Sequence, residues 1–106
     1  MQRVLTSHSG EAHGEAAARA LLVSGRAALG VGAKEWRELP RTAPEKTALA
    51  WWLRERTTVT LKWVSEELGL GHYTRVSQAV SRMQRQPGRK LEQLKRRLLQ
   101  TEKETA

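Results

Sequence analysis

The 106-residue sequence contains no cysteine, no phenylalanine and no aspartate. Without cysteine, the chain has no disulfide framework, no thiolate metal ligand and no thiol nucleophile. No apolar run approaches the roughly 20 residues that a membrane-spanning helix needs, and the N-terminus lacks the apolar core of a secretion signal. We therefore expect a cytoplasmic protein of one domain, with a core built mostly from leucine, valine and alanine.

Groups that could carry catalysis or hold a metal are also scarce. His8 and His13 lie five residues apart, but two histidines without further ligands rarely form a metal site. Every carboxylate side chain is a glutamate, and none clusters with a histidine. The sequence has no Ser–His arrangement and no glycine loop that would hold a phosphate. These observations predict a protein that is not an enzyme and binds no metal or cofactor.

Positive charge dominates and is unevenly placed. The formal net charge is +8, of which residues 1–42 carry +2 (six basic, four acidic) and residues 43–106 carry +6 (thirteen basic, seven acidic). Between Leu68 and Leu91 there are five basic residues and no acidic one. Such a concentration is typical of a surface that binds a phosphate backbone. A membrane surface is also anionic, but this segment has no bulky aromatic face to insert into it.

The N-terminal part predicts a helical hairpin after a disordered start. Residues 1–10 have no hydrophobic period and are expected to be disordered. Residues 11–40 begin with an alanine-rich helix, and Gly25 on its apolar face marks a point where another helix could cross closely. A short second helix should turn Trp36 and Leu39 inward. The hairpin would shield one side of the next unit.

A third helix is expected to start at the capping box of Thr42 and Glu45. Pro44 suits the first turn, because its missing amide would be unpaired there anyway. Trp51 and Trp52 are adjacent and point about 100° apart, so both cannot be fully buried on one apolar stripe. We expect one to pack against the hairpin and the other to remain partly exposed, at the edge of the core or as a partner surface.

Residues 57–85 predict two short helices joined by a glycine turn. Thr60 is a suitable N-cap for the first, because its hydroxyl can accept a hydrogen bond from an amide of the first turn. Gly69 can take the left-handed conformation that ends a helix, and Leu70 can turn back into the core. The second helix is expected over residues 73–85. The apolar faces are expected to consist of Leu61, Val64 and Leu68 in the first helix and Val76, Ala79, Val80 and Met83 in the second.

Two crossed helices with a short glycine turn are the helix-turn-helix arrangement, whose second helix enters the major groove. The apolar positions Val76 and Ala79 arrive one residue late, so we expect a longer turn than in the phage repressors. The second helix should begin near an N-cap at His72 or Thr74. A helical hairpin that only packs against its neighbours is the alternative, and the charge pattern favours the first interpretation.

A last, basic helix places Leu91, Leu94 and Leu98 on one side. We expect these leucines to pack back on the domain, because two turns are too few for a stable zipper. The chain would then be a monomer, with a weak homodimer as the alternative. Residues 101–106 are expected to be a disordered tail. The predicted fold is all-α, a small helical bundle in which residues 41–100 form the helix-turn-helix domain.

The chain resembles a known family from Glu15 to Met83, most closely over residues 45–80, EKTALAWWLRERTTVTLKWVSEELGLGHYTRVSQAV. This segment is similar to the C-terminal region of REP-associated tyrosine transposase-like proteins of bacteria. More loosely, residues 69–80 resemble the DNA-reading helix of DnaA and of Trp-repressor-like domains. The residues that carry the transposase resemblance are Lys46, Leu49, Ala50, Leu53, Arg54, Thr57, Thr58, Thr60, Leu61, Lys62, Trp63 and Val64.

The resemblance implies a DNA-recognition module of a transposase-like protein, with a role in transposition. The family's nuclease domain uses a His-hydrophobe-His metal motif and a tyrosine nucleophile, and this chain has neither pattern. Gly71, His72 and Tyr73 stand where DnaA has Arg-Asp-His, so its base contacts are not carried over. Tyr73 is instead expected to contact phosphate or a base.

The predicted DNA contacts divide by role. Phosphate contacts fix the register, and side chains at the base edges read the sequence. Arg75 is the candidate for a guanine and Gln78 for an adenine. The DNA is duplex or hairpin. An RNA-binding or protein-interaction domain that uses exposed tryptophans and the basic last helix is the alternative. The predicted phosphate contacts are Thr58, Thr60, Lys62, Arg82 and Arg85, and the residues expected at the base edges are Tyr73, Thr74, Arg75, Ser77, Gln78 and Ser81.

Overall fold

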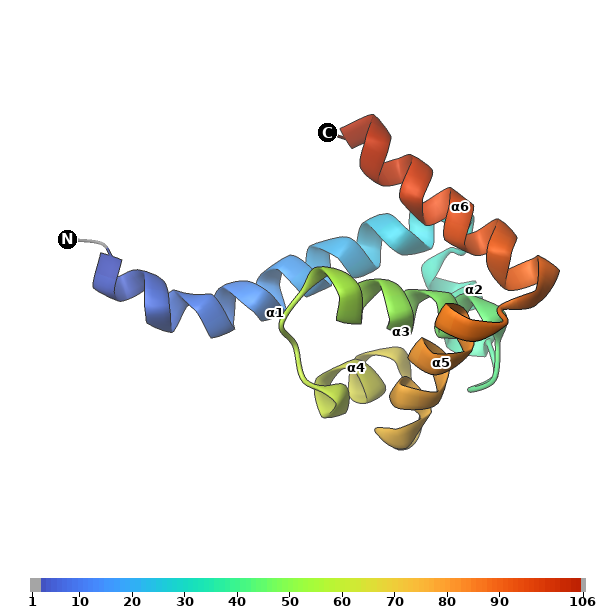
Figure 1. Cartoon of the computed structure of the whole chain (residues 1–106), viewed down its shortest axis with the longest axis horizontal. Coiled ribbons are helices and arrows are strands. Elements are labelled where there is room, and N and C mark those ends of the chain that lie inside the picture. Colours follow the sequence, from blue (N-terminus) through green and yellow to red (C-terminus); the bar gives the residue numbers. More distant parts are fainter. Residues whose placement is uncertain (1–2, 106) are drawn as a thin grey trace.

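The computed structural model describes the backbone of residues 3–105 and the side chains of residues 14–102. Over that range the chain forms α-helices and no β-strand, which confirms the all-α class (Figure 1). The helices are α1 (Arg3–Ala28), α2 (Ala33–Glu38), α3 (Pro44–Arg56), α4 (Leu61–Leu68), α5 (Thr74–Arg85) and α6 (Gly88–Thr105).

Helix α3 occupies the centre of the structure, with α1, α4, α5 and α6 packed against it (Figure 1). Its buried residues follow one another without interruption from Ala48 to Leu53. Neighbours on several sides explain this, because a helix covered on one face buries only a stripe. Trp51 and Trp52 are both buried, with exposed fractions of 6% and 1%. The prediction that one of them stays partly exposed is wrong, because it assumed a single covered face.

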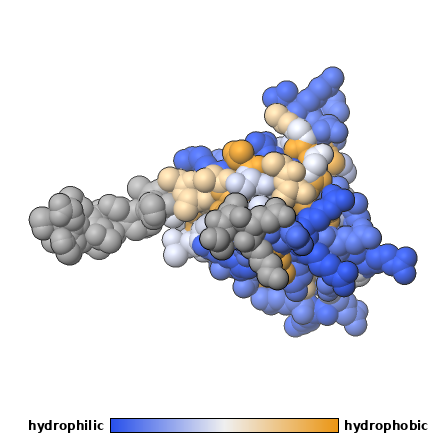
Figure 2. Space-filling model, turned by 90° about the horizontal axis from the view of Figure 1, so that it is seen from above, coloured by the Kyte–Doolittle hydropathy of each residue, from blue (hydrophilic) through white to orange (hydrophobic). Residues whose placement is uncertain are grey.

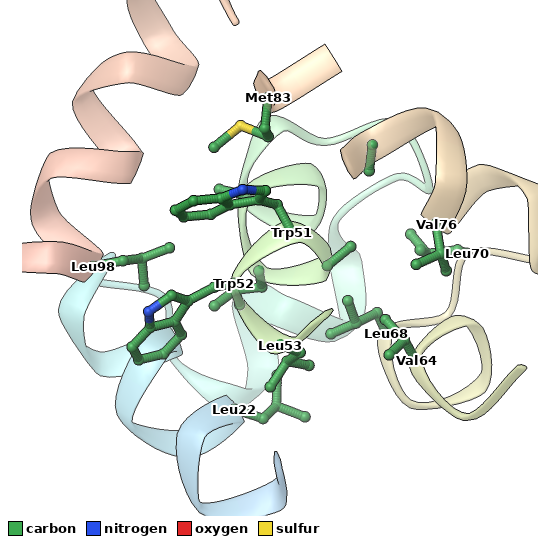
Figure 3. Packing of buried hydrophobic residues seen from close by; sticks show 14 of the residues in the cluster. Leu22, Trp51, Trp52, Leu53, Val64, Leu68, Leu70, Val76, Met83 and Leu98 are labelled. Carbon is green, nitrogen blue, oxygen red and sulfur yellow. The ribbon is translucent and has the colours of Figure 1, made fainter. Parts of the chain in front are cut away.

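The two tryptophans fill different parts of the core. The Trp51 side chain extends toward Met83 of α5, and the Trp52 side chain lies beside Leu98 of α6 (Figure 3). Nζ of Lys95 lies 5.3 Å from the centroid of the Trp51 ring, within range of a cation–π contact. Because the rings point to different neighbours, one helix anchors both the helix pair α4–α5 and the C-terminal helix.

Gly25 permits the close approach of α1 and α3. A Cβ atom added at Gly25 would lie 2.4 Å from Cδ2 of Leu49 and 2.9 Å from the Trp52 ring. Both of these side chains are fully buried, so neither can move aside without disturbing the core. The predicted close crossing at Gly25 is confirmed.

Helix α3 begins differently from the prediction. Ala43 is the N-cap and Pro44 follows it, and within the described residues no side chain caps this helix. The Ala43 carbonyl accepts the Lys46 amide at 3.0 Å, and Ala43 itself is buried. The capping box of Thr42 and Glu45 is therefore wrong. Burial of Ala43 sets the start of the helix and leaves Thr42 exposed outside it.

Helices reach both ends of the described backbone. Helix α1 begins at Arg3 and α6 ends at Thr105. The disorder expected for residues 1–10 and 101–106 stays a prediction. The reason for the extension of α6 is visible in its contacts with α3, since Glu102 is bonded to two α3 side chains.

Helix α2 and its tryptophan lie where the sequence places them. Trp36 is buried and Leu39 is half-buried, as expected. Arg26 from α1 and Lys46 from α3 lie 5.9 Å and 5.5 Å from the centroid of the Trp36 ring. Two cations on one aromatic ring join three helices at this corner of the structure.

Helix α6 turns its leucines inward. Leu91, Leu94 and Leu98 are buried, and the helix packs on α3 and α1. The prediction that the last helix packs back on the domain is confirmed. These leucines are occupied within one chain, so a homodimer would need another surface.

Glu102 fastens the end of α6 to α3. Its carboxylate accepts a hydrogen bond from Trp52 Nε1 at 2.7 Å and another from Arg56 Nη2 at 3.0 Å, and it forms an ion pair with Arg56 Nε. The hydrogen bond from Arg56 is the largest cause that holds the pKa of Glu102 below its ordinary value of 4.5. Protonation of Glu102 would therefore weaken the attachment of α6.

Acid should weaken the fold through Glu102. Because its pKa is lowered in the folded state, its contribution is fully present above its unfolded pKa and is lost as the pH falls through the folded value. We expect Glu102→Gln to cost about 1 kcal/mol of unfolding free energy near pH 7, since the pair is partly exposed, and progressively less as acid protonates Glu102. Urea unfolding from pH 2 to 7 measures both. An equal loss at every pH, or the same loss in Glu92→Gln on the same helix, would contradict this role.

Candidate functional site

Helix α4 and the turn that follows it have the capping residues that the sequence predicts. Thr60 Oγ1 accepts a hydrogen bond from the Trp63 amide at 3.0 Å. Gly69 adopts the left-handed conformation with φ of 68°, and the next amide, of Leu70, donates to the Ser65 carbonyl at 2.9 Å. Leu70 is 3% exposed. The N-cap, the turn glycine and the buried turn leucine are all confirmed.

The start of α5 is capped by a ring nitrogen. Tyr73 is the N-cap residue but caps with no side chain of its own. Instead, the Thr74 amide donates to Nδ1 of His72 at 3.2 Å, and the His72 carbonyl accepts the Arg75 amide at 3.1 Å. The predicted cap at His72 or Thr74 falls one residue to either side of the N-cap, and His72 supplies the acceptor.

Helix α5 has one buried face and one polar face. Val76, Ala79 and Met83 are buried against the rest of the structure, and the helix packs on α3 and α4. With about 100° between successive residues, Gln78 and Arg85 lie on the side opposite to the buried residues. Arg75 and Arg82 lie together on one flank, and Ser77 on the other. The outward face thus carries basic and neutral polar side chains only.

All the predicted contact residues are at the surface, but they do not all lie on one face. Thr58 lies beside α1, since a Cβ added at Gly14 would be 2.7 Å from its Oγ1. The hydroxyl of Thr60 is used to cap α4. The structure brings together the residues of α5. Ser81 is half-buried, and the exposed members are Thr58, Thr60, Lys62, Tyr73, Thr74, Arg75, Ser77, Gln78, Arg82 and Arg85.

Two concavities flank the outward face of α5. The first is an open depression of about 810 Å³ lined by polar side chains. The second has a volume of about 180 Å³ and lies where the start of α3 meets α5. Gln78 and Arg82 line both. The first is lined by Ser77, Gln78, Ser81, Arg82, Arg85 and Gln86, and the second by Arg41, Thr42, Thr47, Arg75, Gln78, Ala79 and Arg82.

Arg41, Thr42, Thr47 and Gln86 are the site residues that sequence reasoning missed. Gln86 could have been found, because it directly follows the basic helix. The other three precede α5 by more than 25 positions. Arg41 and Thr42 come just before α3, and Thr47 lies within it. No local pattern marks them, since only the packing of α3 against α5 brings them beside Arg82.

Lys46 adds positive charge below this surface. It is buried, with Nζ donating to the Leu39 carbonyl at 3.3 Å. Burial is the first cause that lowers its pKa from 10.5, and the nearby positive charge of Arg41 is the second. A buried lysine with a single protein acceptor raises the positive potential of the neighbouring surface.

The other faces of the protein differ from this one. Seen from above the view of Figure 1, the surface is mostly hydrophilic but has apolar residues between its hydrophilic parts (Figure 2). Val23 of α1 is 58% exposed. Three of the four tryptophans, Trp36, Trp51 and Trp52, are buried. Trp63 is half-buried, and Cζ of Arg19 lies over its ring, 5.6 Å from the centroid. None of the four tryptophan side chains is fully exposed.

The described part of the chain has neither a cluster of metal ligands nor a helix able to span a membrane. Among the described residues, no three histidine or glutamate side chains gather as possible metal ligands. The side chains of His8 and His13 lie outside that part of the chain. Within the described residues, no helix has the length and apolar character needed to cross a membrane.

Known proteins give no further guidance. No protein-family model, no curated protein and no solved structure matches this chain. The resemblance of residues 45–80 to transposase-like proteins therefore stays a prediction from the residues, and the candidate site is defined by the surface of α5.

Proposed function

We propose that this protein binds DNA, with α4 and α5 as a helix-turn-helix whose second helix enters the major groove. The observation that carries the proposal is the division of α5. One face is anchored on α3 by Val76, Ala79 and Met83, and the opposite face carries arginine, glutamine, serine and threonine without an acidic residue. The anchored face gives these side chains a fixed position, and their types are those that contact phosphates and base edges.

The contacts would divide between backbone and bases. Lys62, Arg82 and Arg85 would bind phosphates and fix the register. Tyr73 and Thr74 stand at the N-terminal end of α5, which is the part of a recognition helix that reaches the bases. Arg75 would contact a guanine and Gln78 an adenine. Ser77 and Ser81 line the same open depression and would add shorter contacts. We further propose that the module serves a transposase-like protein, which rests on the sequence resemblance alone.

A second candidate, binding of a hairpin or single strand, is favoured by one observation. The rings of His72 and Tyr73 stack with centroids 4.4 Å apart, and Tyr73 is 50% exposed. An exposed aromatic pair can stack on an unpaired base. The pair stands at the N-terminal end of the basic helix α5. A duplex with an unpaired end could therefore contact both the helix and the aromatic pair.

Fluorescence anisotropy with labelled duplex and hairpin DNA tests the proposal. We expect submicromolar to micromolar binding at low salt. If Lys62, Arg82 and Arg85 are the cationic contacts, log K should fall with log salt with a slope of about −2.7, which is 3 × −0.9. A preference for hairpin over duplex would favour the stacked pair as a contact. Absence of binding to both ligands at low salt would overturn the proposal.

A further inference from the structure

The smaller concavity beside α5 is built around an arginine from outside the helix pair. Arg41 precedes α3 and is exposed. Its guanidinium lies across Gly71, where an added Cβ would be 3.0 Å from Nη1 and 3.2 Å from Cζ. Gly71 has φ of 91°, a conformation that glycine adopts at little cost. The turn thus has both the backbone shape and the space that place Arg41 beside the start of α5.

The lining of this concavity is strongly cationic. Arg41, Arg75 and Arg82 contribute three guanidinium groups, and the described lining contains no acidic residue. Among the side chains of residues 14–102, the salt bridge that forms is between Arg56 and Glu102, so none of the three arginines is neutralised by a carboxylate there. Arginines held close together without a counter-charge repel one another, and an anion between them would relieve this.

Hydroxyl groups complete the site. Thr42 and Thr47 lie on the α3 side of the concavity, opposite the α5 arginines. Guanidinium forks and hydroxyl donors are the groups that proteins use to bind phosphate oxygens.

We propose that Arg41 and Arg82, with the hydroxyls of Thr42 and Thr47, hold one phosphate group of the nucleic-acid backbone. The inference rests on the proposed function, because Gln78 and Arg82 line both this concavity and the depression along α5. A strand whose bases meet α5 would therefore pass its backbone over Arg41. Arg75 adds to the positive potential at the edge of the site.

The test is anisotropy of the same labelled duplex with Arg41→Ala, using Arg97→Ala as the matched control. Arg97 is an exposed arginine on α6 that lines a different depression with Ala28 and Gln100. With Arg41 as a fourth cationic contact, the wild-type salt slope becomes about −3.6 and that of Arg41→Ala about −2.7. We expect Arg41→Ala to weaken binding about tenfold on every sequence. Arg41→Lys should keep the slope but regain only part of the affinity, because it lacks the fork.

The outcomes separate this inference from the proposed function. If the wild type binds DNA and Arg41→Ala matches Arg97→Ala in affinity and slope, the phosphate site is wrong while binding by α5 stands. If the wild type binds no DNA, the proposed function fails, and inorganic phosphate at constant ionic strength becomes the probe. Shifts of the Thr42 and Thr47 amide signals that vanish in Arg41→Ala would then support a phosphate site for a free anion, and unchanged signals would overturn it.

Discussion

A chain in which alanine replaces Trp52 is expected to lose about 3–5 kcal/mol of unfolding free energy. Trp52 is 1% exposed and fills the space between α3 and Leu98 of α6 (Figure 3). Its indole also donates to Glu102, so the substitution leaves a cavity and removes one of the bonds that hold α6. A domain of this size has roughly 5–15 kcal/mol in total, so much of the stability would be lost.

Urea unfolding followed by circular dichroism measures this loss of unfolding free energy. Two further variants serve as comparisons. Trp52→Phe keeps most of the volume but not the hydrogen bond, so it should cost clearly less than Trp52→Ala. Trp63→Ala removes a half-buried ring at the edge of the core and should also cost less. If Trp52→Ala and Trp63→Ala were equally stable, α3 would not be the centre of the core.

The helix pair α4–α5 could be predicted almost completely from the sequence, because its signals are local. A cap such as Thr60 and a turn glycine such as Gly69 act within a few residues of themselves. The buried positions Val76 and Met83 follow from helical periodicity along one exposed helix. These features depend little on the rest of the chain, so reasoning over a short window suffices.

Helix α3 was less predictable for the opposite reason. Periodicity assumes that one face is covered, whereas α3 is covered on several sides. The signal was present in the uninterrupted apolar run from Ala48 to Leu53, which is typical of a helix buried all round. The capping box failed similarly, because the burial of Ala43 outweighed the local chemistry of Thr42. In both places tertiary packing decided between local alternatives.

The candidate site was predictable only where it lies on one helix. Gln78 and Arg85 share a face of α5 by periodicity alone. Arg41 reaches the same surface only through the packing of α3 on α5, and the turn at Gly71 makes room for it. A sequence window contains no information on such a meeting of distant segments, so Arg41 could not be assigned without the structure.

Two side chains of α5, those of Arg75 and Gln78, are expected to set the base preference at a selected DNA site. Gln78→Ala and Arg75→Ala should each cost about 1–3 kcal/mol there and relax the preference at one base pair. The physical reason is that each side chain makes its bidentate contact only with one matching base. Its truncation therefore weakens binding to sites that carry this base and leaves binding to other sites nearly unchanged. Gln78 faces outward on α5, so truncating it should not disturb the buried face. Site selection from a random duplex library, repeated with each variant, measures the preference.

Arg85→Ala and Lys62→Ala are the matched controls, because they remove cations from the same surface without a predicted base contact. Each should weaken all sequences alike and reduce the salt slope by about 1, leaving the selected site unchanged. Gln78→Ala carries no change in charge, so its salt slope should equal that of the wild type. If the preferred sequence were identical for Gln78→Ala, Arg75→Ala and wild type, then α5 would contact only the backbone. Recognition would then have to come from the shape of the DNA or from His72 and Tyr73 at the end of the helix.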